Sequence, residues 1–243
     1  MSLYLFCTFV ILLAFGGEAL FGFGGGLVAV PLISLVIDVR DAVVLVSVFQ
    51  FLIGFLIIKN YRSVAWYLMP PLLVGMFAGV FVGVYALSVL SVSVLRILLA
   101  IFIFAFLTKT FFAPKFAVKA PSVAAGAASG FLAGFFQGCL SMGGPNLVIY
   151  LKELLPDPRA FRASMIFWLS VANVIRIPFT DQGNLYSPVV VELTSMILPV
   201  FIIGAILGQR FHQRIPASLY FRTVYVFLFL AAASLLIRTV MAR

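Results

Sequence analysis

The chain has 243 residues, of which 64% are hydrophobic and 9% are charged, and its formal net charge is +9. A soluble domain has about a quarter charged residues, and a soluble core of this length could not bury so much apolar surface. The composition therefore excludes a soluble globular protein. The positive charge does not indicate nucleic-acid binding, because the basic residues lie between apolar segments, where they fit contact with anionic membrane lipids.

Eight apolar segments follow one another along the chain, and charged residues occupy the breaks between them. The segments cover residues 3–37, 42–58, 64–85, 92–111, 122–155, 160–177, 190–209 and 218–240. A helix needs about 20 apolar residues to cross the ~30 Å hydrocarbon core of a bilayer. The sequence therefore predicts an all-α, multi-pass membrane protein. A single signal peptide or anchor does not explain apolar segments that recur along the whole chain.

Segments 3–37 and 122–155 are too long for one span and too short for two spans joined by a turn. Each contains a glycine cluster, residues 22–26 in the first and residues 138–145 in the second. Glycine destabilises a helix interior by about 1 kcal/mol, and Pro145 suits the first turn of a new helix. We predict that each segment is a re-entrant pair of half-helices, with a non-helical tip buried in protein or lining a wet cavity.

The two halves of the sequence resemble each other, which predicts one repeat over residues 1–119 and a second over residues 120–243. A shift of 119 residues pairs Gly24 with Gly143, Gly25 with Gly144, Asp38 with Asp157, Arg40 with Arg159 and Glu18 with Gln137. A shift of 129 residues pairs Pro70 with Pro199, Gly75 with Gly204 and Gly79 with Gly208.

The orientation of the two repeats follows from the positions of lysine and arginine. A repeat with one re-entrant pair and three transmembrane helices crosses the membrane an odd number of times, so the second repeat is inverted. The loops 59–62, 109–119, 152–162 and 209–216 then share one face and carry ten Lys and Arg residues. This distribution obeys the positive-inside rule and predicts that both termini lie outside the cytoplasm.

The two glycine breaks form the candidate substrate site. A helix that begins within the membrane presents free N–H groups and about half a positive charge at its N-terminus, so two such ends can bind an anion without ionised side chains. The candidate substrate-binding residues are Gly24, Gly25, Gly26, Gln137, Ser141, Gly143, Gly144, Pro145 and Asn146. Close helix packing at small residues is the alternative, and it suits Gly75 and Gly79 better than it suits the breaks.

Three ionisable residues are further candidates. Glu18 is the only acid predicted deep in an apolar segment, and it either carries a proton that couples transport or caps the backbone of the nearby loop. Lys152 and Arg176 either attract the anion in transit or snorkel to the membrane interface. One histidine and two cysteines in no shared motif predict neither a metal site nor a cofactor.

The residues around both breaks resemble the sulfite exporter TauE/SafE family of membrane transporters. The similar stretches are FGFGGGLVAVP at residues 21–31 and QGCLSMGGP at residues 137–145, and the two-half layout extends the likeness over nearly the whole chain. The resemblance implies that the protein moves sulfite, sulfonates or related small organic anions across the bacterial cytoplasmic membrane.

We therefore expect a secondary transporter that exports a small anion by alternating access, and not an enzyme. Export is favourable because the membrane potential lowers the free energy of an anion that leaves an inside-negative cell, by about 2.3 kcal/mol per charge per 100 mV. An anion channel and a proton-coupled importer of a small organic anion are the alternatives, and a non-transporting assembly factor would not need polar residues at the breaks. The expected partners are the anion and membrane lipids, with a homodimer left open.

Overall fold

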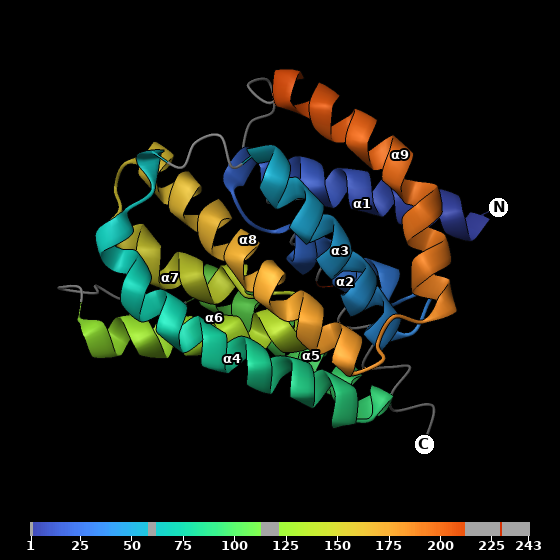
Figure 1. Cartoon of the computed structure of the whole chain (residues 1–243), viewed down its shortest axis with the longest axis horizontal. Helices are drawn as coiled ribbons and strands as arrows, with labels where there is room; N and C mark the ends of the chain where they lie inside the picture. The colour runs from blue at the N-terminus through green and yellow to red at the C-terminus, as the bar shows by residue number, and fades with distance from the viewer. Residues whose placement is uncertain (1, 58–61, 113–121, 212–228, 230–243) are drawn as a thin grey trace.

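The computed structural model describes residues 2–57, 62–112, 122–211 and 229, and the regular elements in these ranges are all helical (Figure 1). The first half contains α1 (Ser2–Phe21), α2 (Gly25–Ile33), α3 (Val39–Ile57), the short 3₁₀ helix η2 (Trp66–Leu68), α4 (Met69–Val89) and α5 (Val92–Phe112). The second half contains α6 (Val123–Leu140), α7 (Gly144–Leu154), α8 (Pro158–Gln182) and α9 (Pro188–Phe211). The all-α prediction is confirmed for the described ranges.

Three stretches of helix in the described ranges are long and apolar enough to cross a membrane. They are Trp66–Val89, Val123–Leu140 and Pro158–Gln182. Shorter apolar helical stretches lie at Leu3–Ala19, Val92–Thr108 and Pro188–Ile203. The protein is therefore a multi-pass membrane protein by the length and composition of its helices. The predicted segment 218–240 lies outside the described residues, apart from residue 229, as do parts of three of the four loops on which the orientation was based.

Both glycine clusters interrupt the helical backbone where the sequence predicts a break. The first break covers residues 22–24, between α1 and α2, and the second covers residues 141–143, between α6 and α7. Gly22 and Ser141, which are 119 residues apart, both adopt the left-handed conformation, with φ of 85° and 56°. This conformation ends a helix and turns the chain, so α2 packs back on α1 and α7 packs back on α6.

The arms of each pair differ in length, which corrects the prediction of two half-helices. α1 and α6 have 20 and 18 residues, whereas α2 and α7 have 9 and 11. At 1.5 Å per residue the long arms measure about 27–30 Å and the short arms about 14–16 Å. The long arms match the thickness of the hydrocarbon core and only the short arms are half-helices, because the breaks lie late in segments 3–37 and 122–155.

The helix order of the first half is repeated in the second. The first residues of α2 and α7, of α3 and α8, and of α4 and α9 are each 119 residues apart. The 129-residue shift was wrong as a structural alignment, because it pairs Pro70, in the first turn of α4, with Pro199, in the interior of α9. Short sequence similarity between two apolar helices can arise from composition alone.

The contacts between helices are also repeated when each helix is replaced by its counterpart in the other half. α6 packs against α4 as α1 packs against α9, and α7 packs against α8 as α2 packs against α3. The contact of α8 with α4 likewise corresponds to that of α3 with α9. Figure 1 shows α4 and α6 along one edge of the molecule, α1 and α9 along the opposite edge, and α3 and α8 between them.

Glycines of α4 and α6 bring the backbones of these two helices into direct contact. A Cβ atom added at Gly75 or Gly79 would overlap the carbonyl oxygen of Ala127 or Phe131 on α6, and one added at Gly130 would overlap that of Leu72 on α4. Small residues at four-residue spacing allow this close approach in membranes. The packing interpretation of Gly75 and Gly79 is confirmed.

Candidate functional site

The two breaks contact each other inside the helix assembly. A Cβ atom added at Gly26, in the first turn of α2, would overlap the backbone carbonyl of Ser141 in the second break. A Cβ atom added at Gly144, the first residue of α7, would lie 3.2 Å from the Cβ atom of Phe23 in the first break. Gly26 and Gly144 are both buried. The sequence pattern thus located two segments that the fold brings together, and glycine is needed there because a side chain would push them apart.

Glu18 and Gln137 occupy corresponding positions in the two halves. Each accepts a hydrogen bond from a backbone N–H group at the break that follows it. The N–H of Gly25 donates to Oε2 of Glu18 at 2.9 Å, and the N–H of Gly143 donates to Oε1 of Gln137 at 2.9 Å. Both side chains are buried. The chain's own oxygen atoms therefore accept from N–H groups at the starts of α2 and α7, in the manner of helix-capping side chains.

Buried amide side chains connect the first break to the second. A side-chain hydrogen bond joins Glu18 to Gln50 of α3. Nε2 of Gln137 donates to Oε1 of Gln50 at 2.8 Å and to Oδ1 of Asn173 on α8 at 3.0 Å. Nε2 of Gln50 also donates to the Ser141 carbonyl at 3.2 Å. Glu18, Gln50, Gln137 and Asn173 thus form one hydrogen-bonded chain, which we call the amide chain.

Two arginines of α8 bind backbone carbonyls near the ends of the long arms. Arg162 donates from Nη2 to the carbonyl of Ala19 on α1. Arg176 donates from Nη1 to the carbonyl of Gln137 on α6 at 3.0 Å, and also to the hydroxyl of Ser141. The Ser141 hydroxyl in turn donates to the carbonyl of Val43 at 2.9 Å. A positive charge at a helix C-terminus is favourable, and these bonds hold Ser141 in its left-handed conformation, which is uncommon for a residue other than glycine.

The Arg176 side chain is 1% exposed, and part of its guanidinium group has no hydrogen-bond partner. Nε and Nη2 are both buried and unpaired. In the described part of the chain, no carboxylate lies within salt-bridge distance of Arg176. The Nε–H and one Nη2–H point in the same direction and form a two-pronged donor, the geometry with which arginine binds two oxygens of one oxyanion. The snorkelling interpretation of Arg176 is wrong.

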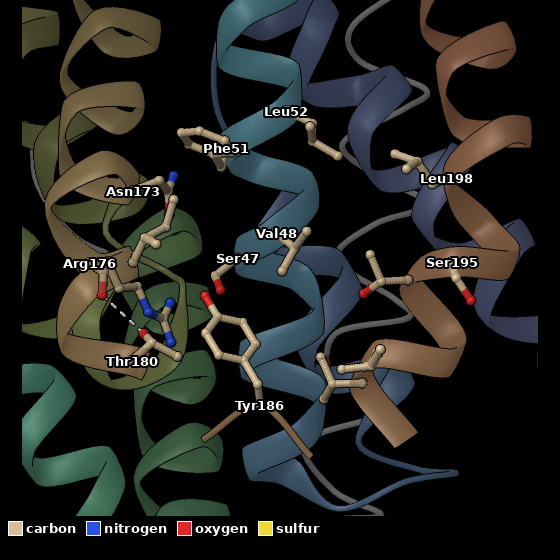
Figure 2. A pocket seen from close by; sticks show the side chains of 14 residues that line it. Ser47, Val48, Phe51, Leu52, Asn173, Arg176, Thr180, Tyr186, Ser195 and Leu198 are labelled. Carbon is tan, nitrogen blue, oxygen red and sulfur yellow. Dashed lines mark hydrogen bonds between the residues drawn. The ribbon is translucent and has the colours of Figure 1, made fainter. Parts of the chain in front are cut away.

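Arg176 lines a cavity of about 530 Å³ between α3, α8 and α9 (Figure 2). Its polar lining residues are Ser47, Asn173, Arg176, Thr180, Tyr186, Thr194 and Ser195. Its apolar lining residues are Val48, Phe51, Leu52, Ile177, Val190, Val191 and Leu198. A concave, largely apolar site with a few converging polar groups is typical of small-molecule binding.

The predicted site residues divide between this cavity and the neighbouring breaks. Arg176 alone among them lines the cavity, and Gln137 and Ser141 contact Arg176 directly. The remaining break residues, which do not line it, are Gly24, Gly25, Gly26, Gly143, Gly144, Pro145 and Asn146. The amide nitrogen of Asn146 is buried without a partner in the described residues, and Lys152 is exposed at the end of α7.

Sequence reasoning missed Asn173 and Thr180, which lie on the same face of α8 as Arg176. A signal was present, because Asn173, Arg176 and Thr180 are spaced by three and four residues, the spacing of one helical face. Polar residues aligned in this way along an apolar helix indicate an interior or a cavity rather than lipid. Ser47 and Tyr186 carried no comparable signal, since they reach the cavity from α3 and from the loop between α8 and α9.

Together these features define a multi-pass α-helical membrane protein with a buried, charged internal site. The profile of the sulfite exporter TauE/SafE family matches residues 7–235. The chain belongs to this family of membrane transporters for sulfur-containing anions. No match was found among curated proteins or among solved structures.

Proposed function

We propose that this protein is a secondary transporter that exports a small sulfur-containing anion across the bacterial cytoplasmic membrane, and that Arg176 binds the anion in the cavity between α3, α8 and α9. The observation that carries the proposal is the two-pronged donor of Arg176, which is buried at the cavity and unpaired. A buried charge without a partner is strongly unfavourable. An oxyanion in the cavity would supply both the opposite charge and two acceptor oxygens.

We further propose that residues 1–119 and 120–243 are inverted repeats and that transport proceeds by alternating access. The support is that corresponding helices of the two halves make corresponding contacts: α1 packs on α9 as α6 packs on α4. Inverted repeats of this kind place a substrate site between the halves, where one half can rock against the other. The breaks, with Gly24, Gly25, Gly26, Gly143, Gly144, Pro145 and Asn146, lie where such a movement would change the backbone, and their helix N-termini would add positive potential.

Transport by purified protein in proteoliposomes tests this function. Sulfite, thiosulfate, sulfonates and carboxylates should be compared for uptake and for counterflow of a labelled anion. A carrier is expected to show saturable uptake and counterflow with at least one sulfur-containing anion. Single-channel conductance would instead assign the protein to the anion channels, and preference for carboxylates over every sulfur-containing anion would contradict the proposed substrate class.

Proton-coupled import is a second candidate function, because the amide chain links Glu18 to a residue that lines the cavity. Glu18 is 4% exposed and bonds to Gln50, while Asn173 at the other end of the chain lies one helical turn from Arg176. A proton on Glu18 would change which of these groups donates and which accepts. The occupancy of the anion site and the protonation of Glu18 could then influence each other through this chain.

The substitution Glu18→Gln separates these two functions. We expect the variant to fold and to transport with the parent's dependence on a pH gradient, because Gln137 already caps the second break with an amide oxygen at the same distance. Uptake should be measured with the internal pH clamped and the external pH varied. If the variant still binds the anion but its transport no longer responds to the gradient, Glu18 is a coupling residue and the capping role is insufficient.

A further inference from the structure

We propose that four residues of α3, η2 and α8 form a closed gate, which separates the cavity of Arg176 from the membrane face at which α8 begins. The gate consists of two contacts, one between Gly54 and Ser170 and one between Trp66 and Phe167. This inference rests on the proposed alternating access. It specifies which end of the cavity is closed and which side chains close it.

The cavity occupies only one end of the interface between α3 and α8. Its lining residues on these helices fall within residues 47–52 of α3 and 173–180 of α8. Beyond Thr180 the lining continues with Tyr186, in the loop between α8 and α9, and with Val191, in the first turn of α9. Val191 is 57% exposed, so the cavity meets the molecular surface near this loop. This end of the cavity is the open one.

α3 and α8 contact each other directly just beyond the opposite end of the cavity. A Cβ atom added at Gly54 of α3 would overlap Oγ of Ser170 on α8 and would lie 3.0 Å from its Cβ atom. Gly54 lies two residues after Leu52, and Ser170 lies three residues before Asn173. Because Leu52 and Asn173 line the cavity, this contact marks its inner end, and no anion can pass between the two helices there.

Two aromatic rings extend this closure by about one turn of α8. The rings of Trp66 and Phe167 make an edge-to-face contact, with their centroids 4.9 Å apart, and such pairs add stability beyond the area that they bury. The N–H of Ala65 donates to Oγ of Ser164 at 3.0 Å. Ser164, Phe167 and Ser170 follow one another at three-residue intervals, so these contacts form a continuous seal from the cavity toward the start of α8.

The 119-residue shift relates the gate to the lining of the cavity. Three of the four gate residues have counterparts that line the cavity, and the fourth has its counterpart in the loop between α8 and α9. The counterparts of Gly54, Trp66, Phe167 and Ser170 are, in this order, Asn173, Leu185, Val48 and Phe51. Inverted repeats that exchange their conformations during transport would therefore close the cavity by bringing these counterparts together.

The accessibility of a cysteine in the cavity tests the gate. Ser47→Cys places a thiol at a lining position that is 7% exposed. Its reaction with the membrane-impermeant reagent 2-sulfonatoethyl methanethiosulfonate should be followed in right-side-out and inside-out vesicles. Gln182→Cys and Ser63→Cys, at exposed positions, identify the open face and the gate face of the protein, respectively. Ser47→Cys should react at least tenfold faster from the open face. The parent, in which both cysteines are buried, is the blank.

Removal of both aromatic rings should open the gate. In a protein that also carries Trp66→Ala and Phe167→Ala, the thiol of Ser47→Cys should react at least tenfold faster from the gate face than it does without these substitutions. The reason is that α8 loses the ring contact that holds it against η2. Its reaction from the open face should stay unchanged, which verifies that the cavity still forms.

A matched control removes two aromatic rings from another contact of α8. Phe77→Ala with Phe81→Ala deletes two rings of α4 that contact Phe179 on α8, away from the gate. This double variant should change neither rate of reaction. If it opens the gate face as much as the loss of Trp66 and Phe167 does, the effect is not specific and the gate is wrong.

The outcomes separate the gate from the function on which it rests. If Ser47→Cys reacts equally fast from both faces, or if loss of the two gate rings leaves its reaction from the gate face unchanged, the gate is wrong, and transport of sulfur-containing anions in proteoliposomes is unaffected. If the rates change as expected but no sulfur-containing anion is transported, the gate stands and the proposed function fails.

Discussion

Replacing Arg176 with methionine is expected to abolish anion transport and leave a folded protein. Removing one partner of a buried, hydrogen-bonded charge pair costs about 2–5 kcal/mol, which corresponds to a loss of binding of about 30-fold to several thousand-fold. Methionine replaces the unbranched, flexible stem of the arginine side chain and lacks the guanidinium group. Binding should be measured by calorimetry with the purified protein, and transport should be measured in proteoliposomes.

The stability of the same variant distinguishes a binding role from a structural one. Methionine removes the hydrogen bonds from Arg176 to Gln137 and Ser141, but it also removes a buried cation of which two nitrogens are unpaired. We expect these two effects to offset each other, so the melting temperature should stay close to that of the parent. Arg176→Lys should recover only part of the binding, because an ammonium group keeps the charge without the two-pronged geometry. Lys152→Ala, at an exposed position, should change binding little and serves as the control for lost positive charge.

A contrary result would assign the anion site to the helix N-termini. If Arg176→Met binds sulfonates like the parent while Asn146→Ala loses binding, the anion lies at the start of α7. The buried amide nitrogen of Asn146, which has no partner in the described residues, would then be the donor. Loss of one hydrogen bond to a charged group would cost about 1.5–3 kcal/mol.

Of the substitutions considered for this protein, Gly79→Leu should lower the free energy of unfolding the most. A Cβ atom at this position would overlap the carbonyl oxygen of Phe131, and the next nearest atom is also backbone, the nitrogen of Phe135. Neither can rotate away as a side chain can, so α4 and α6 must separate. We expect a destabilisation of about 3 kcal/mol or more, at or above the upper end of the usual range for overpacked sites. Thermal unfolding in detergent measures it.

Gly16→Ala is the matched control for this experiment. Gly16 also lies within a helix, but a Cβ atom there would meet nothing within 4 Å. The alanine should stabilise α1 by up to about 1 kcal/mol through its higher helix propensity, whereas Gly79→Ala should destabilise the protein. If both alanine variants melt alike, direct backbone contact between α4 and α6 is wrong.

The sequence by itself determined the helical membrane class and the positions of both breaks. Hydropathy over a window of residues decides whether a segment can lie in lipid. Glycine, which lacks a Cβ atom, allows backbone conformations that other residues rarely adopt. Both are local properties, so the breaks at residues 22–24 and 141–143 and the 119-residue repeat could be predicted without a structure. The lengths of the arms could not, since a glycine cluster spreads over several residues and does not show which of them ends the helix.

Only the tertiary structure decided the place of Arg176. The predicted segment ends at residue 177, which would leave Arg176 beside the membrane interface, but α8 continues through Pro178 to Gln182. Whether a long cationic side chain snorkels or turns inward depends on the helices around it, and α3, α6 and α9 come from distant parts of the chain. Their packing buries the guanidinium group against Ser141 and opens the cavity beside it, which no local pattern encodes.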